Sequence, residues 1–331
     1  HESRGLGDVY KRQILGCGKI ARKFVNDLSL LGNAKLYAAA SRSLDNAKQF
    51  AEDFGFEKAY GSYEEMVADQ EVDIVYIATP HAMHMAHSIL CLEHKKAVLC
   101  EKAFAMNTKE VDRMIQASKD NNTFLMEAFW TIFSAKFRKV LELSQEKDLG
   151  QLRFVKSDFM FKADFDPEKR LYNIDLGAGS LLDIGIYPIF RSLMLLGKPD
   201  SIKTMANIRP TGVEDSISML FGYDNGAMAV LTSSFESSCH NETELCFEHG
   251  YIKFIREPEF PILIERNGVK EEVYVKQPDG MGYELEAKHV MECLDKDLIE
   301  SPVLPLATSR DLMEIMDAVR KDAGIIFPKH D

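Results

Sequence analysis

The chain has 331 residues, of which 46% are hydrophobic, so it is long enough for about two domains with packed cores. Its 40 basic and 52 acidic residues give a formal net charge of −12 with no basic block, which argues against nucleic-acid partners and against anionic membranes. The six cysteines form no C-x-x-C pair and no apolar stretch approaches the ~20 residues of a membrane span, so we expect a cytoplasmic protein without a membrane partner.

The first 13 residues are a poor start for a folded domain. A strand that leads into a glycine-rich turn normally brings about 4–8 apolar residues, but here only Ile14 and Leu15 precede Gly16. We therefore expect residues 1–13 to be a leader foreign to the protein, and we place the start of the first domain at residue 14.

A glycine motif follows this short strand and opens a predicted helix over residues 18–31. Glycines at these positions let the backbone approach a pyrophosphate at the positive N-terminus of a helix. An ordinary glycine turn is the alternative, but a position at the start of an alternating strand and helix region favours a dinucleotide site. The residues of this predicted site are Gly16, Gly18, Lys19, Ile20 and Ala21.

Strand and helix patterns alternate as far as residue 129. Residues 35–40 and the Val- and Ile-rich residues 72–78 are predicted strands, and residues 44–54 are a predicted helix between them. Such alternation predicts a Rossmann domain with a doubly wound parallel sheet over residues 14–129.

The end of the second strand bears on the choice of cofactor. An NAD site normally places an acidic residue about 20 positions after the glycines, where it binds the ribose 2′-hydroxyl. Here Ser41 and Arg42 offer a hydroxyl and a guanidinium, which suit a 2′-phosphate, so we predict NADP. Asp45 keeps NAD open as the less favoured cofactor, and a solvated arginine in a loop is the structural alternative.

Three histidines follow the next strand, in the run Thr79-Pro80-His81-x-x-His84-x-x-His87. Their spacing spreads the rings over roughly 120° of a helix, and no nearby Cys or carboxylate completes a tetrahedron, so we predict no metal site. We expect Thr79, His81 and His84 to lie beside the cofactor and His87 to be structural.

A lysine stands at the end of the apolar run 97–100, in the stretch Glu101-Lys102-Ala103. The ligand crevice of an open parallel sheet lies outside the carboxyl ends of its strands, so Lys102 is expected to project into that crevice with Glu101 beside it. A solvated lysine at a strand edge is the alternative reading of this residue alone.

The pattern changes after residue 129. Predicted strands follow one another with few helices between them, and an Asn-Gly hairpin turn occupies residues 222–226, so we expect an α+β domain with a large, mostly antiparallel open sheet over residues 130–308. The predicted strands are 153–162, 201–208, 215–223, 227–235, 243–247 and 251–256. One long helix is predicted over 180–196 and two close the chain, and residues 309–331 pack back on the body.

The long helix begins with Gly177-Ala178-Gly179 and carries Asp183 and Tyr187 four residues apart, on one face. A carboxylate and a phenol among Leu and Ile need partners if they are buried, and a hydrogen bond within the core is one explanation. The functional explanation requires Lys102 nearby, because an ammonium beside a tyrosine lowers the pKa of its hydroxyl from about 10 and makes it a usable proton acceptor.

Together these motifs resemble the glucose-fructose oxidoreductase, inositol dehydrogenase and MocA (Gfo/Idh/MocA) family of NAD(P)-dependent oxidoreductases, in particular its dihydrodiol dehydrogenase and D-xylose dehydrogenase branch. The resemblance implies that Tyr187 is the catalytic acid/base, that Lys102 is its electrostatic partner, and that Asp183 assists them. It also implies a homodimer formed through the sheet of the second domain. Ala103 stands where the family has proline, and Ala178 replaces a glycine of the family's pattern.

The function that we predict is an NADP-dependent dehydrogenase. A hydride would pass between the nicotinamide and a secondary or anomeric alcohol of a cyclic diol or a sugar. The expected pocket residues Trp130 and Phe165 suit either substrate, since an aromatic ring packs against a flat diol or the apolar face of a sugar. A catalytically silent NADP-binding regulator of the same fold is the rival interpretation.

Overall fold

The chain folds into two compact units, each built around one sheet. The structure is a computed structural model that describes residues 10–257, 259–276 and 278–331. Unit 1 consists of residues 1–134 and 278–310, and unit 2 consists of residues 135–277 and 311–331. The predicted leader of residues 1–13 lies outside the described residues up to residue 9, and the first strand begins at Tyr10.

The sheet of unit 1 has six strands in the order β3-β2-β1-β4-β5-β6, and every pairing is parallel. β1 lies between β2 and β4, so the order of the strands reverses there, and the carboxyl ends of these strands form the edge at which such sheets bind ligands. The strands are β1 (Tyr10–Leu15), β2 (Ala34–Ala40), β3 (Lys58–Tyr60), β4 (Ile74–Ile77), β5 (Ala97–Glu101) and β6 (Leu125–Ala128).

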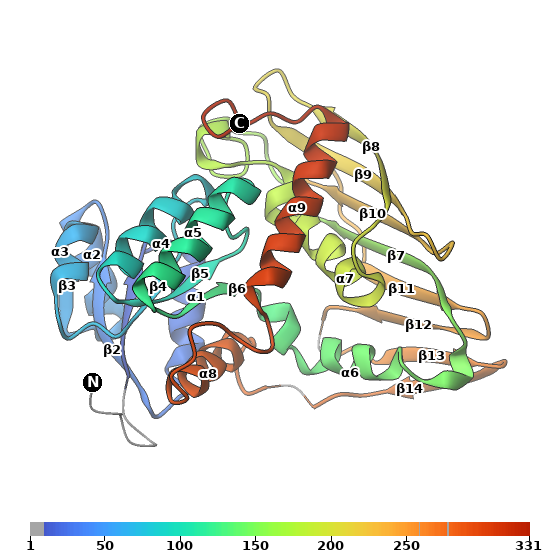
Figure 1. Cartoon of the computed structure of the whole chain (residues 1–331), viewed down its shortest axis with the longest axis horizontal. Helices are drawn as coiled ribbons and strands as arrows, with labels where there is room; N and C mark the ends of the chain where they lie inside the picture. Colours follow the sequence, from blue (N-terminus) through green and yellow to red (C-terminus); the bar gives the residue numbers. More distant parts are fainter. Residues whose placement is uncertain (1–9, 258, 277) are drawn as a thin grey trace. The chain divides into compact units, whose positions relative to one another are not determined.

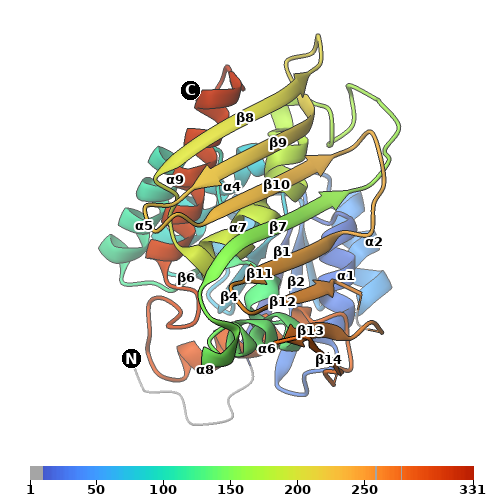
Figure 2. The same cartoon turned by 90° about the vertical axis from the view of Figure 1, so that its right-hand side faces the viewer.

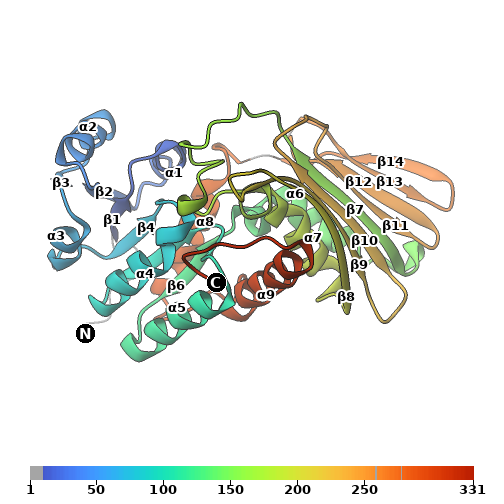
Figure 3. The ribbon, with the colours of Figure 1, turned by 90° about the horizontal axis from the view of Figure 1, so that it is seen from above.

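Helices cover both faces of this sheet (Figures 1 and 3). Helices α1, α2 and α8 lie on one face and α3, α4 and α5 on the other (Figure 3). Their bounds are α1 (Lys19–Leu28), α2 (Leu44–Phe54), α3 (Tyr63–Ala68), α4 (His84–Glu93), α5 (Thr108–Asn121) and α8 (Tyr283–Leu294), with short 3₁₀ turns η1 (His81–Met83) and η2 (Trp130–Phe133). The predicted doubly wound parallel sheet is confirmed.

The boundaries of the units differ from those expected from the sequence. The segment that holds α8, Pro278–Arg310, belongs to unit 1, although it follows the whole of the second sheet in the chain. Its attachment is specific, because Leu125 at the start of β6 donates its N–H to the carbonyl of Ile299, and Asp27 of α1 accepts the N–H groups of Met281 and Tyr283. Contacts of this kind join residues far apart in the chain, which periodicity does not reveal.

The sheet of unit 2 has eight strands in the order β14-β13-β12-β11-β7-β10-β9-β8 (Figure 2). β7 and β10 pair in parallel and the other neighbours are antiparallel, which confirms the expected mostly antiparallel sheet. The strands are β7 (Leu152–Met160), β8 (Ser201–Ile208), β9 (Glu214–Gly222), β10 (Met228–Ser234), β11 (Glu242–Phe247), β12 (Gly250–Ile255), β13 (Ile262–Arg266) and β14 (Val269–Val273).

One face of this sheet packs against α6 (Ala135–Leu143) and α7 (Ile186–Leu196), and no helix of the described chain covers the other face (Figures 2 and 3). Alternate residues such as Ile217, Met219 and Phe221 are buried against the helices, as their spacing predicts. The long helix α9 (Leu306–Ala323) divides between the units at residue 310. The remaining 3₁₀ turns are η3 (Lys147–Leu149) and η4 (Ile174–Leu176).

Two expectations from the sequence need correction. β13 and β14 were not predicted, because both are short and β14 is mostly charged, although Asn267-Gly268 between them forms the positive-φ turn of a hairpin. One run, Ile174–Leu196, is long and apolar enough to cross a membrane, contrary to the expectation that no such run exists. Its most apolar window is 78% buried inside the protein, as in the core helix of a globular domain.

Candidate functional site

The glycine turn of unit 1 brings the ends of β1 and β4 together. Gly16 has φ +98°, and an added Cβ would lie 2.9 Å from the carbonyl oxygen of Ala78 and 3.1 Å from Cγ2 of Thr79. Gly18 is the N-cap of α1 and no side chain caps that end. The first turn of α1 therefore presents its backbone N–H groups, beside Lys19 and Ile20, at the edge where a pyrophosphate would bind.

The end of β2 leads into α2 through Ser41, Arg42 and Ser43. The hydroxyl of Ser43 accepts the N–H of Asn46 and so caps α2, while Ser41 Oγ accepts the N–H of Ser43 at 3.3 Å. Arg42 is exposed. Arg42 thus follows the ligand end of β2, where a group for the 2′-phosphate is expected.

The three histidines at the end of β4 have different surroundings. His87 Nδ1 lies 3.0 Å from Thr79 Oγ1, and His81 is 7% exposed, with its ring nearly perpendicular to that of His84 at a centroid distance of 5.6 Å. His84 is fully buried, and its two ring nitrogens lie 2.8 Å from the carbonyl oxygen of Thr79 and 2.7 Å from that of Ala103. Both polar atoms of His84 are therefore directed at the backbone.

Lys102 follows β5 directly, in a loop whose backbone is held by carboxylates. Glu101 accepts the N–H of Lys102 at 3.1 Å and the hydroxyl of Tyr76, and Glu127 of β6 accepts the N–H of Phe104 at 3.1 Å. The Lys102–Ala103 peptide bond is cis. Burial raises the pKa of Glu127 to about 7. The lysine is thus carried by an anchored loop at the ligand end of the sheet, with Glu101 almost fully buried beneath it.

Trp130 also belongs to unit 1, at the start of the turn that follows β6. Its ring packs against Tyr283 of α8 with centroids 6.3 Å apart, and it lies 3.8 Å from the position of a Cβ on Gly282. Trp130, an expected pocket residue, therefore packs against residues of the segment 278–310, which was expected to belong to the second domain.

In unit 2, Asp183 lies in a π-helical turn, Leu181–Gly185, and Tyr187 lies in the first turn of α7. Single π turns within helices occur frequently at functional sites. Asp183 is 7% exposed and binds the guanidinium of Arg170 at 2.8 and 3.4 Å. Tyr187 is 8% exposed, with its ring 5.4 Å from that of Phe159. Asp183 and Tyr187 share one helical segment, whereas Lys102 and Trp130 belong to unit 1.

The glycines before this helix have a structural cause. Gly179 has φ +124°, and an added Cβ would lie 2.4 to 2.7 Å from the carboxyl group of Glu214. That carboxyl accepts the N–H of Leu181 at 2.7 Å and so holds the first turn of the segment that carries Asp183 and Tyr187. Burial raises the pKa of Glu214 to about 7.

We expect Gly179→Ala to lower the free energy of unfolding by about 3 kcal/mol, because the backbone strain and the collision with Glu214 add. The matched control is Gly197→Ala at the other end of α7, which also has a positive φ but has no atom within 4 Å of the added Cβ, and which should cost about 1 kcal/mol. Urea unfolding monitored by tryptophan fluorescence and circular dichroism compares the two. Equal losses would show that the Glu214 contact has no effect.

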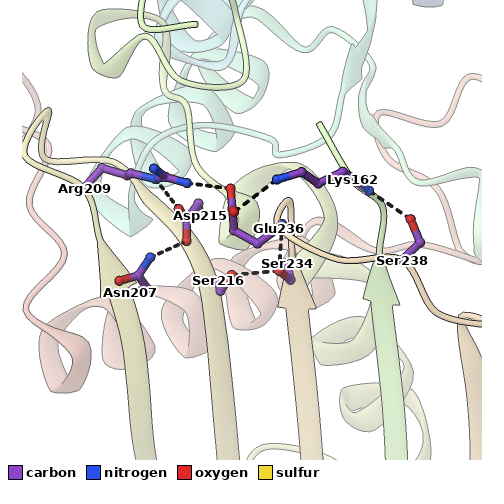
Figure 4. A network of polar contacts seen from close by, with 8 residues as sticks. All are labelled: Lys162, Asn207, Arg209, Asp215, Ser216, Ser234, Glu236 and Ser238. Carbon is purple, nitrogen blue, oxygen red and sulfur yellow. Dashed lines mark hydrogen bonds and ion pairs between the residues drawn. The ribbon is translucent and has the colours of Figure 1, made fainter. Parts of the chain in front are cut away.

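Phe165 contacts a member of a network of charged side chains in unit 2, and Figure 4 shows the network itself. Its ring is 45% exposed, lies edge-on to Tyr172 at 5.0 Å, and has the guanidinium of Arg209 at 5.0 Å. Arg209 in turn binds Asp215 and Glu236, and Glu236 also binds Lys162 at 3.1 Å. Lys162 joins the start of the segment that carries Phe165 to this network, whose charged members were not predicted from the sequence.

Among residues 10–257, 259–276 and 278–331, no group of three or more His, Cys, Asp or Glu side chains is placed to hold a metal ion.

Comparisons with known proteins agree with this architecture. Residues 11–129 match the model of an oxidoreductase family with an NAD-binding Rossmann fold, and residues 137–253 match that of the GFO/IDH/MocA C-terminal domain. The trans-1,2-dihydrobenzene-1,2-diol dehydrogenase of Mus musculus is 36% identical over 328 residues, which cover 96% of this chain and 97% of the relative. That of Xenopus tropicalis is 34% identical over 329 residues, covering 95% and 98%.

Solved structures show the same fold over nearly the whole chain. A 3-ketoreductase from Actinomadura kijaniata, in complex with NADP and TDP-benzene, is 25% identical with a TM-score of 0.87 and covers 96% of this chain and 98% of its own. An aldose-aldose oxidoreductase from Caulobacter crescentus, complexed with glycerol, is 23% identical with the same TM-score and the same coverage.

Proposed function

We propose, since the chain belongs to the Gfo/Idh/MocA oxidoreductase family and is an NAD(P)-dependent dehydrogenase, that it transfers a hydride between NADP and a secondary or anomeric alcohol carbon. The substrate is a cyclic diol or a sugar, the classes named for the relatives and the structural neighbours. The observation that carries the proposal is the anchored loop that presents Lys102 at the ligand end of a dinucleotide-binding sheet.

The bound nicotinamide supplies the hydride acceptor in the oxidation direction. In that direction the alcohol carbon loses a hydride and its hydroxyl loses a proton, which Tyr187 accepts. Lys102 favours the phenolate of the tyrosine through its positive charge, and Asp183, which binds Arg170, assists the two. In the reverse direction Tyr187 returns the proton to the alkoxide as the carbonyl is reduced.

The choice of NADP rests on Ser41 and Arg42 at the end of β2. We predict that Arg42→Ala weakens NADP binding by about 10-fold or more, because a hydrogen bond to a charged phosphate is lost, and leaves NAD binding unchanged. Isothermal titration with both cofactors measures this. Lys48→Ala on the exposed side of α2 is the control for the loss of one positive charge. Equal weakening of NADP and NAD would assign Arg42 no role in the choice.

A homodimer through the open face of the second sheet is also part of the proposal. Met205 is 81% exposed on this face, and Leu220, Met228 and Val230 are 44, 41 and 39% exposed. Val230 and Leu220 are direct cross-strand partners, so the apolar groups form one cluster on a face that no described helix covers. Clusters of this kind commonly mark protein interfaces.

We predict that Val230→Asp together with Leu220→Lys converts a dimer into a monomer, because a dimer would bury both charges. Sedimentation velocity measures the change. Val269→Asp on the edge strand β14, where Val269 is 62% exposed, is the control with the same substitution away from the cluster. A monomeric native chain would contradict the proposed dimer.

The acidic composition supports, as further parts of the proposal, a cytoplasmic location without nucleic-acid or membrane partners.

The test of the function is a panel of cyclic trans-dihydrodiols and aldoses, with reduction of NADP as the readout. Turnover of at least one member that Lys102→Met abolishes would support the proposal. Cofactor binding without turnover of any member would favour the silent regulator.

A further inference from the structure

One buried histidine joins the two loops that follow β4 and β5. His84 Nε2 lies 2.8 Å from the carbonyl oxygen of Thr79, and Nδ1 lies 2.7 Å from that of Ala103. The ring is fully buried, so its polar atoms do not face solvent. The peptide carbonyl that it holds belongs to the residue directly after Lys102.

The rest of the loop Lys102–Met106, here called the lysine loop, is held by carboxylates on its N–H groups. Glu101 accepts the N–H of Lys102, Glu127 that of Phe104 and Glu110 that of Met106, each at 3.1 Å. These contacts fix the loop to β5, β6 and α5. His84, the first residue of α4, differs from these carboxylates in that it contacts a carbonyl oxygen of the loop, that of Ala103.

The chemistry of the ring suits this task. A carbonyl oxygen only accepts, so a ring nitrogen that forms a hydrogen bond to one of these carbonyls does so as the donor. The ring donates to both carbonyls when both nitrogens are protonated and to one of them when it is neutral, and burial favours the neutral form by lowering the pKa of His84. In either form the rigid ring sets the spacing between the two loops, because it is packed between them without access to water.

We propose that His84 is a positioning residue that fixes Lys102 relative to the Thr79 loop, instead of the cofactor contact that the sequence analysis expected. The inference rests on the proposed function, in which the charge of Lys102 favours the phenolate of the proton-accepting tyrosine. If the lysine loop is released from His84, the position of the Lys102 ammonium is less well defined, so its charge assists the proton transfer to the tyrosine less.

The experiment compares His84→Gln with His87→Gln, a buried histidine on the same helix that contacts the Thr79 side chain and not the lysine loop. His84→Gln should lower kcat about 10-fold or more, move the midpoint of the pH profile of kcat/KM upward toward that of Lys102→Met, and leave the Kd for NADP within about 3-fold. His87→Gln should leave the pH midpoint in place. Near-UV circular dichroism checks that both variants are folded.

Three outcomes separate the possibilities. An unchanged kcat and pH midpoint in His84→Gln, while Lys102→Met is slow, would overturn the role of His84 alone. A weakened Kd for NADP with an unchanged kcat would also overturn it, since it would make His84 a direct cofactor contact. Normal turnover in Lys102→Met would instead overturn the proposed function.

If His84→Gln does not fold, the unsubstituted protein labelled with ¹⁵N-histidine provides the test. The ring nitrogen resonances of His84 should stay in place when NADP is added, because the nitrogens face Thr79 and Ala103. A change typical of a new hydrogen bond to the cofactor would overturn the proposal.

Discussion

Tyr187→Phe is expected to lower turnover by about 100-fold or more while NADP still binds, because the substitution removes the hydroxyl that accepts the proton and keeps the aromatic ring. The ring packs 5.4 Å from that of Phe159, a contact that phenylalanine keeps. Turnover measured at saturating cofactor and substrate, beside a titration of NADP by fluorescence, separates the two effects.

Tyr172→Phe is the matched control for this substitution. Tyr172 is a buried tyrosine of the same unit whose hydroxyl has no hydrogen-bond partner among the residues that the structure describes, so its loss should change neither stability nor rate. Near-normal turnover in Tyr187→Phe would remove this tyrosine from the mechanism.

Lys102→Met should have an effect of similar size, about 100-fold or more, for an electrostatic reason. Methionine has a similar length to the lysine stem but no charge, so the phenolate loses its stabilisation and the pH profile of kcat/KM moves to higher pH. Lys109→Met, an exposed lysine in the first turn of α5, controls for the loss of a positive charge nearby in the chain. A slow Lys102→Met variant with an unchanged pH midpoint would mean that the lysine acts in another way.

The double variant tests whether the two residues act on one step. If both serve a single proton transfer, Tyr187→Phe and Lys102→Met together should be little slower than the slower single variant, since the lysine has no phenolate left to stabilise. Fully additive losses would indicate independent roles.

The sequence was sufficient for the features that depend on short segments. The Gly16 turn and the position of Lys102 directly after β5 follow from local patterns, and the structure has them there. The fold class was predictable for the same reason, because alternation of strands with helices, or of strands with turns, distinguishes the two kinds of sheet.

The sequence was insufficient for features made by contacts between distant residues. Glu127 and Glu214 are ordinary glutamates in the sequence, but one holds the lysine loop and the other holds the helix that carries Tyr187. His84 belongs to a visible histidine motif, yet only its two carbonyl partners show where its nitrogens point. One signal for these contacts was present in the sequence. Glu127 is a charged residue at the end of an apolar strand, and a carboxylate at such a position needs partners if it is buried.

The most direct test of the account is the mass of the reduced cofactor formed from NADP and an alcohol that carries deuterium at its reacting carbon. We predict that the native chain forms NADPH that contains one deuterium, and that Tyr187→Phe forms it about 100-fold or more slowly. Reduced cofactor without the label, or no reduced cofactor from any diol or aldose although NADP is bound, would contradict it.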